Sequence, residues 1–265
     1  MPFTPAHAAV ALPFARVRGV PFTALVIGTQ VPDFAMFFPA FLPSYATTHA
    51  VSAAALWNLP IGLAILVFWE WVKPSTLALF PAALRKRLRP YAEPHWPRGP
   101  LELAAVALAI MVGAASHIVW DAFTHSGRFG TVLIPALQQA WLYRLQGYKI
   151  LQYGCGVLGT LVVLWAARRR LLQQPPHCDL EQIWLEPVRK AQLILYAMTP
   201  LLSAAWTFRT ARYWVLPSRN YFMLLFAHYI ATTSIAAVLV IAACMRALFE
   251  LDRLREPRAA STRAP

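Results

Sequence analysis

The chain has 265 residues, of which 58% are hydrophobic and only 13% are charged. Soluble domains carry about twice that charged fraction, so the composition excludes an ordinary water-soluble globule and predicts a protein that lies in the lipid bilayer. The net charge of +13 does not indicate nucleic-acid binding, because no basic stripe is interleaved with aromatic residues. We expect no nucleic-acid partner and attribute the charge to membrane topology.

The first apolar stretch, residues 20–42, is interrupted by Pro21, Pro32 and Pro39 and carries Asp33 near its middle. Proline removes a backbone donor and breaks helices. Broken backbone at membrane depth is tolerated only where protein or water covers it. We therefore predict a re-entrant or half-buried helical segment here rather than a simple span.

Five later apolar runs are candidates for membrane spans, which need about 20 apolar residues each. They cover residues 49–71, 101–122, 150–167, 191–206 and 222–248. We predict an all-α fold, a polytopic transmembrane helical bundle of about five spans. It would form a single domain over residues 1–255, followed by a disordered polar tail at 256–265.

The segments between these runs alternate in their content of Lys and Arg. Residues 73–100, 168–190 and the tail from 246 hold six, five and five, whereas 123–149 and 207–221 hold three each. Basic residues accumulate on the cytoplasmic side of membrane proteins. The pattern predicts that the C-terminus lies in the cytoplasm and that 123–149 and 207–221 lie outside.

Two of the eleven carboxylates, Asp33 and Asp121, fall outside the segments assigned to the cytoplasm and lie in apolar stretches. An ionisable group at membrane depth costs about 2.5–3.5 kcal/mol, so each should have a partner. His117, Asp121 and His125 recur four residues apart, which places them along one helical face. Imidazole and carboxylate together suit a divalent metal, with zinc first and Mn or Fe as alternatives. A buried His–Asp hydrogen bond that joins two helices is the other interpretation.

Four further residues are candidates for the site, although none is strong evidence by itself. His7 follows Thr4, which could cap a short helix, and His49 could begin one; alone, each is more typical of a structural histidine. Arg209 and Arg212 lie in a segment predicted outside. We predict that they bind substrate, because arginine binds phosphate bidentately; an interfacial, snorkelling role is the alternative.

Several ordered motifs resemble a bacterial integral-membrane family of unknown function. These motifs are MPFTPAHAA, IGTQVPDF, His49 before an apolar run with LPIG, and HIVWDAFTHSG, and they cover about the first 130 residues. Their order is similar to that of predicted membrane-bound metal-dependent hydrolases and, more distantly, of zinc-dependent phospholipase C. The resemblance implies a bacterial inner-membrane protein whose metal ligands are His7, Asp33, His49, His117 and Asp121. The later His-rich motifs of the phospholipases have no clear equivalent, so one or two metals are expected rather than three.

These patterns lead to one hypothesis and two alternatives. The hypothesis is a metal-dependent hydrolase of an amphiphilic substrate, phospholipid-like or a lipid-linked phosphoester, near the outer leaflet. Asp121 and His125 would be catalytic, with His125 as general acid/base, a further carboxylate orienting each histidine ligand, and Gly127 and Gly130 admitting the substrate. The alternatives are a small transporter or proton-coupled protein using the His/Asp cluster, and a non-catalytic membrane scaffold. The sequence does not define the oligomeric state.

Overall fold

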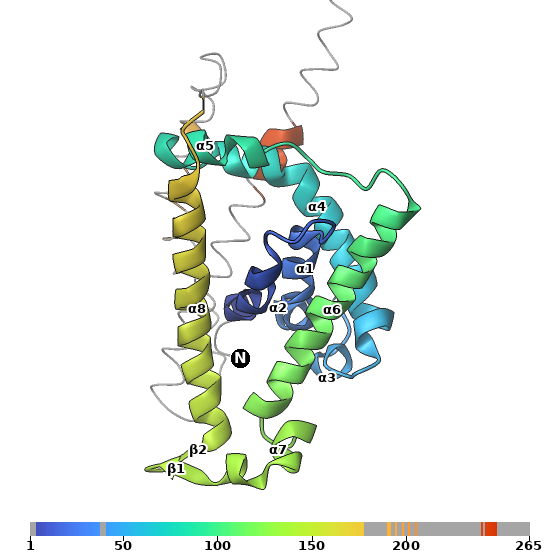
Figure 1. Cartoon of the computed structure of the whole chain (residues 1–265), viewed down its shortest axis with the longest axis vertical. Coiled ribbons are helices and arrows are strands. Elements are labelled where there is room, and N and C mark those ends of the chain that lie inside the picture. Colours follow the sequence, from blue (N-terminus) through green and yellow to red (C-terminus); the bar gives the residue numbers. More distant parts are fainter. Residues whose placement is uncertain are drawn as a thin grey trace, which may run out of the picture. The chain divides into compact units, whose positions relative to one another are not determined.

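The computed structural model describes residues 4–37 and 41–177, together with 190, 191, 194, 198, 201, 205, 240 and 242–247. Over these residues the chain is mostly helical, and the described part contains one short hairpin (Figure 1). The helices that precede the hairpin are η1 (Thr4–Phe14), α1 (Phe22–Gly28), η2 (Val31–Asp33), α2 (Phe34–Phe37), α3 (Tyr45–Thr48), η3 (Ala54–Asn58), α4 (Leu59–Ala78), α5 (Ala82–Leu88), η4 (Arg89–Tyr91), α6 (Pro100–Thr124), α7 (Phe129–Leu133) and η5 (Pro135–Gln138). The strands β1 (Ala140–Leu142) and β2 (Leu145–Gln146) then pair antiparallel and lead into α8 (Gly147–Gln173).

Three helices are long and apolar enough to cross a membrane: Ala54–Ala78, Pro100–Thr124 and Gly147–Gln173. At 1.5 Å per residue each extends at least about 37 Å, more than the hydrocarbon thickness of about 30 Å. On α8 the large apolar side chains Leu158, Leu164 and Trp165 are about 60% exposed, and such a surface requires an apolar solvent. The chain is therefore a helical membrane protein. The predicted spans 191–206 and 222–248 and the predicted tail 256–265 lie almost wholly or wholly outside the described residues.

The ends of these helices follow from the local sequence. The helix α6 begins with Gly99 as its N-cap and Pro100 at the first helical position, where the missing N–H of proline has no consequence. The Glu102 carboxylate accepts a hydrogen bond from the backbone N–H of Arg98 at 2.8 Å, which satisfies a donor that precedes the helix. At the other end His125 is extended, and Gly127 has a φ of +71°, a left-handed conformation that favours glycine.

The segment 20–42 contains no long helix among its described residues. Its main helix, α1, has seven residues and extends about 10 Å, one third of the hydrocarbon thickness. Pro32 lies inside the short 3-10 helix η2 that follows. The structure therefore confirms that the helix is broken in this segment. Re-entry from one side of the membrane stays a prediction.

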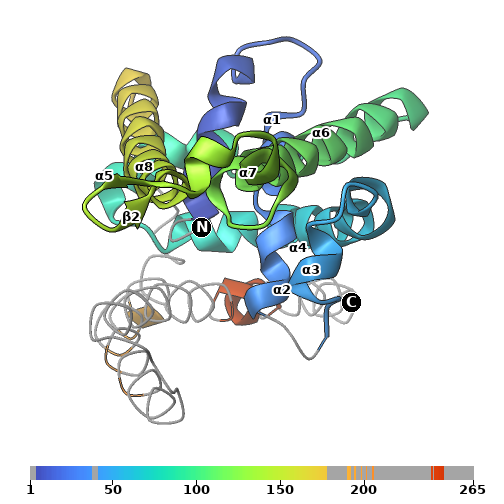
Figure 2. The same ribbon diagram turned by 90° about the horizontal axis from the view of Figure 1, so that it is seen from below.

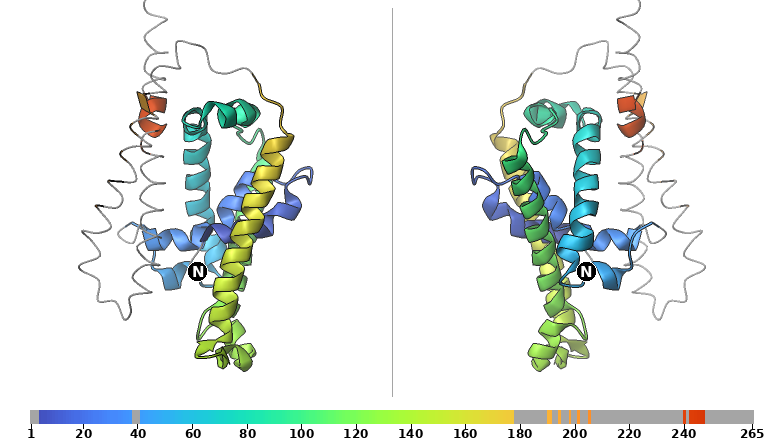
Figure 3. Two further views of the ribbon diagram at one scale, coloured as in Figure 1. Left: turned by 90° about the vertical axis from the view of Figure 1, so that its left-hand side faces the viewer. Right: turned by 90° about the vertical axis from the view of Figure 1, so that its right-hand side faces the viewer.

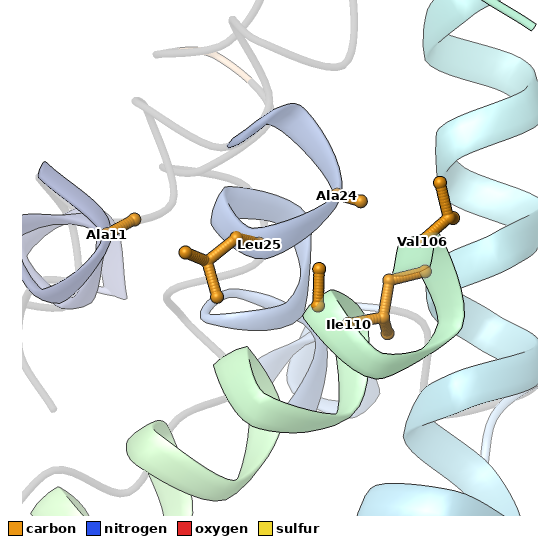
Figure 4. Packing of buried hydrophobic residues seen from close by; sticks show 6 residues of the cluster. Ala11, Ala24, Leu25, Val106 and Ile110 are labelled. Carbon is orange, nitrogen blue, oxygen red and sulfur yellow. The ribbon is translucent and has the colours of Figure 1, made fainter. Parts of the chain in front are cut away.

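The residues group by their contacts into two units, 1–68 with 96–170 and 69–95 with 171–265. The prediction of one domain over 1–255 is not tested by this grouping. The core of the first unit is formed where η1, α1 and α6 meet, and Figure 4 shows its side chains. Its buried members are Ala11, Ala24, Leu25, Val106, Ala109 and Ile110.

Two glycines let α1 and α6 approach closely in the first unit. A Cβ atom added to Gly113 would lie 2.5 Å from the carbonyl oxygen of Leu25, and one added to Gly28 would collide with the backbone of Ile110. Small residues allow such backbone contact between membrane helices. On its other side η1 packs against α8, where a Cβ at Gly159 would come within 2.9 Å of the Ala6 carbonyl oxygen (Figure 3).

The connection between α6 and α8 also belongs to the first unit, and Figure 2 looks onto it from below. The helix α7 packs on the end of α6 through Gly130, where a Cβ would lie 2.7 Å from the Ala122 carbonyl oxygen. The Trp141 indole N–H donates to the carbonyl oxygen of Ala136 at 2.8 Å. The hairpin is the one described departure from the predicted all-α fold.

The second unit has its own small core and a buried ion pair. Val72, Ala78 and Leu79 pack with Ala242 and Met245. The Lys73 ammonium lies 2.5 Å from a Glu70 carboxylate oxygen, and that oxygen also accepts a hydrogen bond from the backbone N–H of His95 at 2.7 Å.

Candidate metal centre

Five of the residues that the sequence singled out lie together in the first unit. They are brought from four elements and are buried, with exposed fractions between 0% and 5%: His7 on η1, Asp33 on η2, His49 after α3, and His117 and Asp121 on α6. Because these residues span more than a hundred positions of sequence, tertiary structure creates the cluster.

Four of these groups offer ligand atoms close enough together to bind one metal ion. One Asp33 oxygen lies 3.4 Å from the His49 Nε2 and 3.5 Å from the His117 Nε2. One Asp121 oxygen lies 3.5 Å from each of the same two nitrogens. All four ligand atoms are within 4.8 Å of one another. Ligands at about 2.1 Å from a tetrahedral metal are separated by about 1.6 times that distance, roughly 3.4 Å.

Most of the polar atoms that face one another here make no hydrogen bonds within the part of the chain that the structure describes. The unsatisfied atoms are Nε2 of His7, His49 and His117 and Oδ1 of Asp33 and Asp121, whereas the Asp121 Oδ2 accepts a hydrogen bond from the Tyr45 hydroxyl. A buried polar atom without a partner costs about 1–3 kcal/mol, so several in one place need an explanation. A cation would satisfy the facing atoms of Asp33, His49 and His117 together.

Hydrogen bonds on the far side of two imidazole rings direct their lone pairs inwards. The Nδ1 of His117 lies 2.8 Å from the Thr29 carbonyl oxygen, and the Nδ1 of His49 lies 3.0 Å from that of Tyr45. A carbonyl oxygen can only accept, so in each ring Nδ1 carries a proton, and the ring in its neutral form would present the Nε2 lone pair to the cluster. We expected carboxylates in this orienting role; the described structure uses backbone carbonyls instead.

Asp33 is oriented by a residue that we expected to cap a helix. The Thr4 hydroxyl donates to the Asp33 Oδ2 at 2.7 Å. This leaves Oδ1 to face the two histidines. Thr48 holds the backbone of the same turn by donating to the Pro32 carbonyl oxygen at 2.8 Å.

His7 contacts the cluster through the second oxygen of Asp121. Its Nε2 lies 3.4 Å from the Asp121 Oδ1, and its ring stacks on that of His117 with centroids 3.7 Å apart. Burial lowers the pKa of the His7 imidazole to about 4, so the ring is neutral near pH 7, the form that binds metal. His7 lies beside the four-membered group rather than within it.

His125 follows the end of α6 instead of continuing its face. Its backbone is extended, and its Nδ1 lies 3.5 Å from the Asp121 Oδ2. Its Nε2 accepts a hydrogen bond from the Gln152 amide of α8 at 3.1 Å. Burial lowers the pKa of this imidazole as well. The ring thus lies next to the cluster without belonging to it.

A cavity of about 230 Å³ opens on the cluster. Two of the four groups, His49 and Asp121, line it, together with Ala50, Val51, Ile118, Ala122, Gly127, Arg128 and Phe129. Of the two glycines that we predicted to admit substrate, Gly127 lines this cavity, whereas Gly130 is buried in the contact with α6. Arg209 and Arg212, the predicted substrate-binding residues, lie outside the described residues.

Sequence reasoning missed two polar side chains at this site. The Tyr45 hydroxyl lies 3.4 Å from the Asp121 Oδ2, and the charge of that carboxylate together with burial raises the pKa of the phenol. The second is Arg128, which lines the cavity. The sequence could have singled it out, because it is the one Lys or Arg between Gly99 and Tyr143 and lies in a segment predicted to be outside.

The fold and the site together define a helical membrane protein in which a buried Asp/His/His/Asp group could hold a metal ion. Residues 1–249 match the family described as Domain of unknown function (DUF4184), and the chain belongs to this family. No curated protein and no solved structure matches the chain. The description of the family states no activity.

Proposed function

We propose that this protein is a membrane-embedded metal-dependent hydrolase that acts on an amphiphilic phosphoester. The observation that carries the proposal is the group of buried Asp33, His49, His117 and Asp121 ligand atoms within 4.8 Å of one another, three of which make no hydrogen bond in the described structure. The proposed metal ligands are these four residues, with His7, whose Nε2 lies 3.4 Å from the second oxygen of Asp121, as a further ligand.

The charge of the cluster favours a divalent cation. No Lys or Arg among the described residues forms an ion pair with Asp33 or Asp121. The two carboxylates carry a charge of −2, which is costly to bury without compensation. Mixed imidazole and carboxylate ligands favour zinc, with Mn or Fe as alternatives.

The cavity favours a catalytic over a purely structural metal. Structural zinc sites are closed by four protein ligands, whereas catalytic sites remain open to water or substrate. Here four protein groups are proposed as ligands, so a catalytic metal would take water or substrate as a fifth ligand from the cavity that His49 and Asp121 line. A bound divalent metal supplies Lewis acidity, which polarises a phosphoryl group and lowers the pKa of a water molecule.

The surrounding residues supply the proton chemistry and the orientation. His125, whose Nδ1 lies 3.5 Å from the Asp121 Oδ2, would act as a general acid/base beside the site. The Gln152 amide holds the imidazole of His125 from the other side. Thr4 and the Thr29 carbonyl fix the orientation of Asp33 and His117.

The position of the site suggests where the substrate comes from. Asp121 lies three residues before the end of α6 at Thr124, which corresponds to about 4.5 Å along the helix. We assign the segment after α6 to the outside and the C-terminus to the cytoplasm of a bacterial inner membrane, from the distribution of basic residues. The substrate would therefore enter from the outer leaflet.

Metal analysis of the purified protein tests the proposal. We expect about one zinc equivalent in the native protein, and at least a tenfold loss of zinc affinity in His117→Ala and in Asp33→Asn. His95→Ala is a matched control, because this imidazole is exposed and lies in the second unit. Hydrolysis of a chromogenic phosphodiester and of phospholipid in mixed micelles should require the added metal.

Two results would contradict the proposal at different levels. A protein that contains no transition metal, and whose melting temperature does not change with zinc, would remove the metal site. A protein that binds zinc, and whose His117→Ala variant loses thermal stability while no hydrolysis is measurable in either, would indicate a metal that only braces the helices.

A further inference from the structure

Arg128 lies on the wall of the cavity that opens on the metal ligands, and the mechanism proposed above does not use it. The cavity is lined both by polar residues, His49, Asp121 and Arg128, and by apolar residues that include Val51 and Phe129. An arginine in such a place is either a partner for a protein carboxylate or a site for an anion from outside. The contacts of its guanidinium decide between these roles.

The guanidinium of Arg128 is held by an aromatic ring and not by a carboxylate. Its Cζ lies 5.6 Å from the centroid of the Tyr45 ring, a distance at which a cation is attracted to the face of the ring. Among the described residues no carboxylate forms an ion pair with it, although Asp121 lines the same cavity. Stacking leaves the N–H donors of the guanidinium available to an anion.

Tyr45 connects this arginine to the metal ligands. Its ring packs on that of His49 with centroids 3.8 Å apart, and its hydroxyl lies 3.4 Å from the Asp121 Oδ2. The same side chain therefore positions the Arg128 charge relative to two proposed ligands. The left-handed Gly127 turn brings Arg128 back to the cavity directly after α6 ends.

The apolar residues of the cavity are exposed. Val51 is 81% exposed and Phe129 is 54% exposed, and α7 also exposes Val132 and Leu133, three and four residues after Phe129. A ligand that satisfies both the polar and the apolar lining has an anionic group joined to an apolar body.

We propose that Arg128 binds the anionic phosphate group of the substrate while Val51 and Phe129 contact its apolar part. This inference rests on the proposed function, because it names the substrate class of the same site. Arg128 is thus a residue for binding and specificity, and the substrate class is an anionic phospholipid-like amphiphile.

Binding measurements on the full chain in neutral detergent test this inference. The probes are inorganic phosphate, micelles doped with short-chain phosphatidic acid, and the same micelles with short-chain phosphatidylcholine. We expect phosphatidic acid to bind most tightly. Arg128→Gln should weaken that binding about 10- to 100-fold, the effect of losing charge-assisted hydrogen bonds. Arg128→Lys should lose less, because the charge remains while the bidentate geometry does not.

The matched control is Arg144→Gln, which removes the same charge from the exposed turn of the nearby hairpin. This variant should bind within about twofold of the native protein. Unchanged binding in Arg128→Gln, or an equal loss in Arg144→Gln, would overturn the inference. Inorganic phosphate that binds as tightly as phosphatidic acid would overturn its apolar part.

Zinc content and melting temperature are measured on every variant, so that the two proposals can fail separately. Zinc content unchanged in Arg128→Gln, together with weakened lipid binding, supports the anion site and excludes misfolding as the cause. A native protein without zinc would contradict the metal proposal, whereas the ratio of lipid affinities between Arg128→Gln and Arg144→Gln would still decide the role of Arg128.

Discussion

The Thr4 hydroxyl determines which oxygen of Asp33 faces the histidines, because it donates to Oδ2 at 2.7 Å and leaves Oδ1 for the cluster. Thr4→Val keeps the shape of this side chain and removes the donor. We expect the variant to fold and its zinc affinity to fall about 10- to 100-fold, as for other residues that orient metal ligands. Competition with a chromophoric chelator measures this affinity.

Thr160→Val is the control for this prediction, since the Thr160 hydroxyl donates only to the Gly156 carbonyl oxygen within α8. Its zinc affinity should equal that of the native protein. An unaltered affinity in Thr4→Val would mean that packing alone orients the Asp33 carboxylate.

At the scale of residues, the sequence identified the side chains of the cluster but not what orients them. Asp33 and Asp121 could be predicted because carboxylates are rare in apolar stretches. The Thr29 and Tyr45 carbonyls that hold His117 and His49 could not, because any residue type supplies the same carbonyl. His7 could be joined to Asp121 only by the resemblance, since its contact depends on how η1 packs between α6 and α8.

At the scale of elements, the close contact between α1 and α6 affects the orientation of the proposed ligand His117. The carbonyl of Thr29 directly follows Gly28, and it reaches His117 because Gly28 and Gly113 allow the two backbones to meet. Gly113→Val should push α1 away from α6. We expect a loss of about 1–3 kcal/mol in stability from overpacking and a lower zinc affinity, although residue 113 touches no ligand atom.

Melting temperature and zinc titration on the same sample measure these two effects. Gly154→Val is the matched control, because an added Cβ at Gly154 in α8 meets no atom within 4 Å. If Gly113→Val retained native zinc affinity, the Thr29 carbonyl would not be needed to orient His117.

Element boundaries were harder to predict than the elements themselves. We expected the first span at residues 49–71, whereas the helical segment covers Ala54–Ala78. His49 ends α3 and turns towards the cluster instead of beginning a helix. Beyond Trp71 the helix continues through Lys73, because Glu70 neutralises the ammonium, and hydropathy alone does not detect such a pair.

At the scale of the whole molecule, the composition predicted the membrane and the distribution of basic residues predicted the orientation. The first inference agrees with three apolar helices long enough to span. The second stays a prediction, and it decides which leaflet can supply a substrate, because His117 and Asp121 lie in the last turns of α6.

Cysteine labelling on the two sides of α6 tests this orientation. His95 and Arg144 are exposed and flank the 25-residue helix. In a background without Cys155, Cys178 and Cys244, we expect a membrane-impermeant maleimide to label Arg144→Cys in spheroplasts. His95→Cys should be labelled only after permeabilisation, because the segment 73–100 holds six basic residues and the segment 123–149 holds three.

Each pattern of labelling has a distinct meaning for the site. Labelling of both cysteines from one side would show that α6 does not cross the membrane and would remove the proposed approach from a leaflet. The reversed pattern would keep α6 as a span and place Asp121 near the cytoplasmic surface, so that the substrate would come from the inner leaflet. The expected pattern places Asp121, which lines the cavity with His49 and Arg128, about 4.5 Å from the outer end of the helix, where the head group of an outer-leaflet phospholipid can enter the cavity.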